Sequence, residues 1–265
     1  MDNYETFANR NENFFTLDNQ ELYDYHLKEL GPSWKYAKET IVYKTNSLSY
    51  RTKELDYFEG KDFILILGSS HTFGTGLNEA DLYHSHIGAK TGLEILNAGY
   101  GAIGPDMIML NALLFLKNTN LKPKAVVIQW PELHRVTFKG NNEFISILPQ
   151  MFITNNSHLS NIISDLEFNE SSKLLKFYRA WTDDRNDLNH SAIFIEVTRL
   201  IWKLYGVPYF DFTLIPPSDV PNNIKLTNFY HLVRDLARDQ VHYGSETHKA
   251  IGLEIYEDLK NNLVV

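Results

Sequence analysis

Three short apolar runs, each followed by a turn residue, are the clearest pattern along the chain. Residues 63–67 precede Gly68, residues 93–97 come shortly before Gly99, and residues 125–130 are closed by Pro131. A continuous apolar run of this length is typical of a strand buried on both faces, as in a parallel sheet. The pattern therefore predicts three central strands.

Helical spacing of apolar residues separates these runs. One helix is expected from Asp106 to Leu116, with Pro105 suited to its first turn. A second helix, with apolar positions between residues 193 and 204, is stopped by Gly206 and leads into a fourth strand at residues 207–212. A last helix is expected over about residues 245–261. Alternating strands and helices predict an α/β fold, a three-layer αβα sandwich with a central parallel sheet.

Two regions break this alternation. Residues 1–60 are polar and rich in tyrosine, and we expect them to form an N-terminal extension packed on the core rather than a second domain. Residues 136–189 are polar and rich in asparagine, and we expect an insertion above the carboxyl ends of the strands, near the active-site edge. The prediction is a single domain over residues 1–265.

Charge and composition narrow the possible functions. The chain of 265 residues carries 25 Lys and Arg against 33 Asp and Glu, so its net charge is −8, which disfavours a nucleic-acid partner. It has no cysteine, which excludes disulfides, cysteine zinc ligands and a cysteine nucleophile. No apolar run reaches membrane-spanning length, and no signal peptide is visible at the N-terminus, so a soluble protein, cytoplasmic by default, is expected.

The first apolar run leads into the segment Gly68-Ser69-Ser70-His71-Thr72-Phe73-Gly74-Thr75-Gly76. A serine where a buried strand turns into a helix lies beside backbone N–H groups that can receive developing negative charge, which suits a nucleophile. A helix-capping turn or a phosphate-binding loop would use similar residues. The Walker pattern is absent, however, and Thr72 replaces the last glycine of the G-x-S-x-G elbow.

These nine residues resemble the first block of the SGNH/GDSL hydrolases, with Ser70 at the position of the nucleophile and Ser69 where the family usually has Asp. Two further blocks follow in the family's order: Asn97-Ala98-Gly99-Tyr100-Gly101 and Asp239-Gln240-Val241-His242. The segment Asn46-Ser47-Leu48-Ser49-Tyr50-Arg51 is similar to one that many larger members carry before the first block. The resemblance covers about residues 41–135 and 207–260.

The resemblance implies a flavodoxin-like sheet and a serine hydrolase that needs no metal or cofactor. Ser70 would be the nucleophile, His242 the general base, Asp239 the residue that orients His242, and Gly101 a backbone donor to the oxyanion. The implied substrate is a small-molecule or carbohydrate carboxylic ester, with O-acetyl groups on carbohydrate as a candidate. For Asp239 and His242 a helix cap and a surface histidine are the plain alternatives.

One departure concerns the family's third block, G-x-N-D, whose asparagine donates to the oxyanion. After the third strand this chain instead reads Gln129-Trp130-Pro131-Glu132-Leu133-His134-Arg135. Gln129, His134 and Arg135 are the candidates to replace the missing asparagine, although for each taken singly a structural role is favoured: a buried glutamine paired with the backbone, or a solvated charged turn. Trp130 could line a pocket or pack in the core, and His71 is expected at the mouth of the active-site crevice.

Two other classes of function are alternatives to an enzyme. A catalytically weak or inactive member would use the same fold for binding or assembly, which the missing asparagine and the unmatched insertion would fit. Nucleotide binding is disfavoured because the glycine spacing and acidic residue of the dinucleotide fingerprint are absent.

Overall fold

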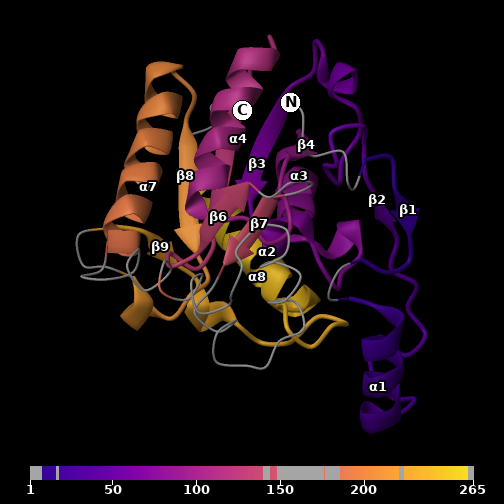
Figure 1. Cartoon of the computed structure of the whole chain (residues 1–265). Coiled ribbons are helices and arrows are strands. Elements are labelled where there is room, and N and C mark those ends of the chain that lie inside the picture. The colour runs from indigo at the N-terminus through magenta and orange to yellow at the C-terminus, as the bar shows by residue number, and fades with distance from the viewer. Residues whose placement is uncertain are drawn as a thin grey trace.

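A central parallel sheet organises the chain in the computed structural model, which describes residues 8–15, 18–139, 144–147, 176, 186–220 and 224–261. Its strand order is β4, β3, β5, β8, β9, and every neighbouring pair is parallel (Figure 1). The strands are β3 (Phe63–Gly68), β4 (Glu94–Asn97), β5 (Ala125–Trp130), β8 (Tyr209–Thr213) and β9 (Thr227–Asn228). Counted along the chain this is the flavodoxin-like order 2-1-3-4-5, so the predicted fold class is confirmed.

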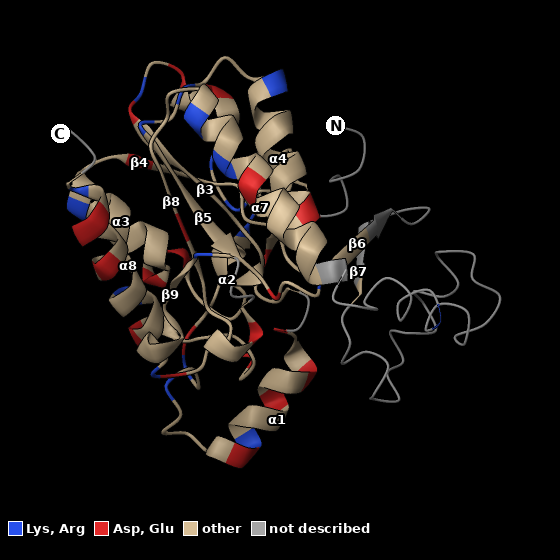
Figure 2. Cartoon of the chain, turned by 90° about the vertical axis from the view of Figure 1, so that its left-hand side faces the viewer, with Lys and Arg blue, Asp and Glu red and all other residues tan. Residues whose placement is uncertain are grey.

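Helices cover both faces of the sheet, as Figure 2 shows. They are α3 (Tyr83–Thr91) and α8 (Ser245–Leu259) on one face, and α4 (Pro105–Asn118) and α7 (Asn186–Leu204) on the other. Along β3, Ile64 and Ile66 pack toward α3 and α8, whereas Leu65 and Leu67 pack toward α4 and α7. Successive side chains point to opposite faces, and both faces are buried, so the run is apolar throughout.

The predicted helix in residues 193–204 exists, but most of its apolar residues face outward. Ile195 is fully buried, whereas Ile193 and Leu200 are about half exposed and Leu204 is 77% exposed. The helix rests on the sheet mainly through other residues, among them the buried Trp202.

The N-terminal residues pack against the start of the α/β unit. They include α1 (Gln20–Leu30), an antiparallel pair of strands β1 (Asn11–Glu12) and β2 (Tyr43–Lys44), and a 3₁₀ turn at Leu55–Phe58. Phe15, Tyr36 and Tyr43 share a buried cluster with Phe73 and Leu77. This cluster lies directly behind the segment that carries Ser70.

Strands β6 (Val136–Lys139) and β7 (Phe144–Ile147) form a separate antiparallel pair at the beginning of the expected insertion. Residues 140–143, 148–175 and 177–185 of the expected insertion lie outside the described residues, and its last residues, 186–189, belong to α7. Short 3₁₀ turns occupy Glu79–Asp81, Pro217–Asp219 and Tyr230–Leu232. Within the described ranges, no helix is both long enough and apolar enough to cross a membrane.

Candidate active site

Ser70 begins the short helix α2 (Ser70–Phe73), immediately after the carboxyl end of β3. Ser69 is extended, and Gly74 ends the helix in the left-handed region at φ 89°. Gly68 must lack a side chain, because an added Cβ would meet the Thr72 hydroxyl at 2.1 Å. The sharp change from strand to helix therefore presents Ser70 at the edge of the sheet, as the sequence predicts.

The structure brings His242 and Asp239 to Ser70 although 172 positions separate Ser70 from His242. The His242 Nε2 atom lies 2.8 Å from Ser70 Oγ, and His242 Nδ1 lies 2.5 Å from Asp239 Oδ2. Asp239 is 2% exposed and His242 is 7% exposed. The three side chains thus form one hydrogen-bonded row with the nucleophile candidate at its outer end.

The Asp239 carboxylate is stabilised in its charged form. Burial acts to raise the pKa of Asp239, but its hydrogen bonds with the His242 ring and with the backbone N–H groups of His242 and Val241 outweigh burial, and the pKa lies below its ordinary value. The two backbone bonds, both to Oδ1, measure 3.0 and 3.1 Å. An ionised carboxylate here fixes the imidazole with its proton on Nδ1, which leaves Nε2 free to accept from Ser70.

A tight turn places Asp239 and His242 on the same side. The Ala237 N–H donates to the His242 carbonyl at 2.8 Å, and Gln240 between them has a positive φ of 56°. Gly76, at φ 80°, lies so close that an added Cβ would meet the Ala237 side chain at 2.7 Å. Gly76, the last glycine of the first sequence block, therefore leaves the space that the turn with Asp239 and His242 occupies.

Two backbone N–H groups beside Ser70 are available as donors. Within the described part of the chain, the N–H groups of Ser70 and Gly101 donate to no other residue. The loop that carries Gly101 is held by Asn97, whose side chain accepts from the Gly99 N–H and donates to the Thr72 carbonyl. A Cβ on Gly101 would meet no atom within 4 Å, so the space beside it is open.

His71 packs against the ring of His242 and is partly exposed. Its ring is 5.0 Å from that of His242, edge on, and stacks on Tyr243 at 4.7 Å. Its Nδ1 is buried and has no hydrogen-bond partner among the described residues. Burial, with neighbouring positive charge, lowers the pKa of His71 well below its ordinary value, so this ring packs neutral against the candidate base.

Gln129 and Trp130 are both buried, so neither is placed to contact a substrate. Gln129 Oε1 accepts from the Ser69 N–H at 3.2 Å and from the Thr72 hydroxyl at 3.3 Å, while its Nε2 donates to the Trp130 carbonyl. Trp130 is 0% exposed, and its indole N–H donates to Asp211. Gln129 is thus turned under the Ser70 segment, and Trp130 packs in the core, because β5 is covered on both faces.

Arg135, another candidate for the missing asparagine, contacts the residue before Ser70 through its side chain. Its Nη1 donates to the Ser69 hydroxyl at 3.1 Å and to the Ile103 carbonyl at 3.4 Å, and its Nη2 donates to Glu132 at 2.6 Å. The side chain of Arg135 is only 9% exposed. A guanidinium group therefore lies next to the residue that precedes Ser70.

Two buried arginines support the site, and motif spacing alone gives neither a role. The Arg51 guanidinium donates to the Gly74 and Leu77 carbonyls and so fixes the loop after α2. Arg238, directly before Asp239, makes a buried ion pair with Asp18. The sequence signal that could have identified both is their place beside the motif blocks: Arg51 ends the segment 46–51, and Arg238 directly precedes Asp239.

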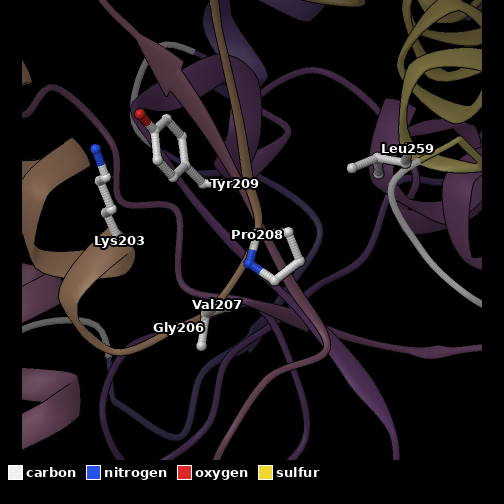
Figure 3. A pocket seen from close by; sticks show the side chains of 6 residues that line it. All are labelled: Lys203, Gly206, Val207, Pro208, Tyr209 and Leu259. Carbon is white, nitrogen blue, oxygen red and sulfur yellow. The ribbon is translucent and has the colours of Figure 1, made fainter.

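No group of three His, Asp or Glu side chains that could hold a metal ion occurs among the residues that the structure describes. A hollow (Figure 3) lies where β8 begins, at the end of the sheet opposite to the one that carries Ser70. It is lined by Lys203, Gly206, Val207, Pro208, Tyr209 and Leu259.

No protein-family model and no curated protein sequence matches the chain. Among solved structures, the chain is similar to a putative lipolytic protein of the G-D-S-L family from Desulfitobacterium hafniense, with 14% identity, a TM-score of 0.34, and coverage of 73% of this chain and 97% of that one. An aryl esterase from M. smegmatis gives 11% identity, a TM-score of 0.37, and coverage of 77% and 100%.

An acetyl xylan esterase from the rumen bacterium Butyrivibrio proteoclasticus gives 12% identity and a TM-score of 0.37 over 76% of this chain and 64% of that one.

Proposed function

We propose that this chain is a serine hydrolase that cleaves carboxylic esters through an acyl intermediate on Ser70. The observation that carries the proposal is the row of Ser70 Oγ, the His242 ring and the Asp239 carboxylate, joined by contacts of 2.8 and 2.5 Å. A partly exposed alcohol, an imidazole and a buried carboxylate in this order are what acyl transfer to serine requires.

The reaction has two halves. In the first, Ser70 Oγ attacks the ester carbonyl while His242 Nε2 takes the hydroxyl proton, and the same nitrogen then gives that proton to the leaving alcohol. In the second, a water molecule loses a proton to His242 and attacks the acyl-serine. His242 then gives that proton to Ser70 Oγ as the bond between Oγ and the acyl carbon breaks, which releases the acid and restores Ser70. Asp239 stays ionised and stabilises the imidazolium in both halves.

Negative charge on the carbonyl oxygen would be held by the N–H groups of Ser70 and Gly101. Both are without a partner in the described chain, and the space beside Gly101 is open. Donors that need no rearrangement when charge develops are the most effective ones. The site needs no cofactor for this chemistry.

The proposed substrate is a small-molecule or carbohydrate carboxylic ester, with O-acetyl groups on carbohydrate as the class to test first. Hydrolysis of p-nitrophenyl acetate, butyrate and octanoate measures the preferred acyl length, and release of acetate from acetylated xylan tests the carbohydrate class. A preference for octanoate would count against an acetylesterase.

The nucleophile is tested with Ser70→Ala. Loss of p-nitrophenyl acetate hydrolysis to near the uncatalysed rate is expected. Ser85→Ala is the matched control, because it also removes a serine hydroxyl, but one that donates to a backbone carbonyl, that of Glu79, and not to His242. Equal rates for wild type and Ser70→Ala would remove Ser70 from the mechanism.

A binding or assembly module of the same fold is the second candidate, favoured because the family's asparagine is missing and Gln129 is turned to the backbone. A fluorophosphonate probe separates the two, because it reacts only with an activated serine. No labelling of the folded protein between pH 6 and 9 would favour the binding module.

A further inference from the structure

Arg135 connects the two loops that carry the proposed oxyanion donors. One nitrogen of its guanidinium donates both to Ser69 Oγ, one residue before Ser70, and to the carbonyl of Ile103, two residues after Gly101. Ser69 is 2% exposed and the Arg135 side chain 9% exposed, so these contacts are shielded from water. Charge-assisted hydrogen bonds are strongest in such surroundings.

Arg135 is held on its solvent side by an ion pair with Glu132. Glu132 accepts from Nη2 at 2.6 Å, and the Glu132 side chain is 46% exposed while that of Arg135 is nearly buried. The carboxylate therefore faces water, and the guanidinium faces the loops. The Arg135 Nε is buried without a partner in the described residues, an unfavourable arrangement that a simple surface ion pair would not need.

Its positive charge also reaches the residues around Ser70. Burial is the main reason why the pKa of His71 is lowered, and the positive charge of Arg135 contributes further. His71 follows Ser70 directly, so the field of Arg135 acts where the negative charge of the intermediate would develop.

We propose that Arg135 is the positioning residue of the oxyanion site and compensates for the missing asparagine of the third block. It does so by holding the Ser69 and Ile103 loops together, so that the N–H groups of Ser70 and Gly101 converge, and by placing a fixed positive charge beside them. This inference rests on the proposed hydrolase function. A planar guanidinium suits the task because its nitrogens donate in several fixed directions at once.

The test uses the rate at which a fluorophosphonate labels Ser70, together with kcat and KM for p-nitrophenyl acetate. For Arg135→Gln, labelling rate and kcat are expected to fall by about 10²-fold, the usual cost of losing oxyanion stabilisation, with KM little changed. Arg135→Lys keeps the charge and is expected to retain a larger share of kcat.

Arg199→Gln is the matched control. Arg199 also pairs with a glutamate three residues earlier, at 2.6 Å, and also bridges to a backbone carbonyl, that of Lys225, but on α7. Its side chain is 15% exposed, close to the value for Arg135. The Arg199→Gln variant is expected to have a lower thermal stability, with the labelling rate and kcat as in wild type.

Should Arg135→Gln not fold, Ser69→Ala removes one of the two loop contacts without disturbing the charge, and a smaller fall in kcat is expected. A wild-type kcat in Arg135→Gln overturns the inference, as does a wild-type kcat in Ser69→Ala where only that variant folds. If Ser70 is still labelled in that case, the proposed hydrolase function stands. A raised KM with unchanged kcat also overturns it, since Arg135 would then bind substrate. Absence of labelling in the wild type overturns both proposals.

Discussion

The buried ion pair between Asp18 and Arg238 ties the N-terminal residues to the turn that carries Asp239. Arg238 Nε and Nη2 donate to the two Asp18 oxygens at 2.8 and 2.7 Å, and the side chains are 3% and 1% exposed. Tyr43 also donates to Asp18 and, through its hydroxyl oxygen, accepts from the Gly76 N–H. In Asp18→Ala the guanidinium would stay buried with the Asn13 carbonyl as its remaining acceptor.

Leaving a buried charge without its partner costs about 3–5 kcal/mol. For a chain of this size each kcal/mol corresponds to roughly 2–4 °C, so the melting temperature of Asp18→Ala should fall by about 6–20 °C. Urea unfolding followed by tryptophan fluorescence measures the free energy of unfolding directly. We expect kcat to fall as well, because Arg238 precedes Asp239 and its N–H donates to the Gly76 carbonyl.

The exposed pair of Asp62 and Lys124 provides the control. Its atoms are 3.3 Å apart and its side chains are 63% and 54% exposed, so Asp62→Ala should cost at most about 1 kcal/mol. A double change, Asp18→Leu with Arg238→Met, should recover much of the loss, since neither charge is then left unpaired. If Asp18→Ala costs no more than Asp62→Ala, water reaches the pair and the reasoning is refuted.

Three further outcomes are expected. Gly101→Pro removes the proposed oxyanion N–H and should lower kcat by about 10²–10³-fold, whereas Gly101→Ala keeps it and should stay near wild type; equal kcat in the two would exclude this donor. Asp239→Asn keeps an acceptor for the backbone N–H groups of the turn but not the correct imidazole tautomer, so kcat should fall by about 10⁴-fold with the fold intact by circular dichroism. Burial lowers the pKa of His248 from 6.5 to about 3, and its Nδ1 accepts from the Tyr83 N–H, so the unfolded chain binds this proton first as the pH falls. The free energy of unfolding should therefore decrease below pH 6.5 by up to about 1.4 kcal/mol per unit for this residue, with a shallower slope in His248→Asn; an unchanged slope would contradict a neutral buried ring.

The apolar runs and the order of helices and strands determined the central sheet. Strands such as β3 and β5 are buried on both faces, so their sequences are apolar without interruption and can be recognised locally. The same local logic identified the turn after Gly68 as a place for Ser70. Spacing could not show which residues of α7 are buried, because Ile193 and Ile195 are equally apolar and only packing on the sheet distinguishes them.

The sequence blocks named Ser70, Asp239 and His242, but only the tertiary structure could place them within hydrogen-bond distance, since the serine and the histidine are 172 positions apart. In the tertiary structure Gln129 and Trp130 are buried, although the sequence placed them at the site, and Arg135 lies beside Ser69. The physical reason is the same in each case. Local sequence fixes backbone preference and the strand or helix that a residue joins, whereas burial and partners depend on segments that meet only when the sheet assembles.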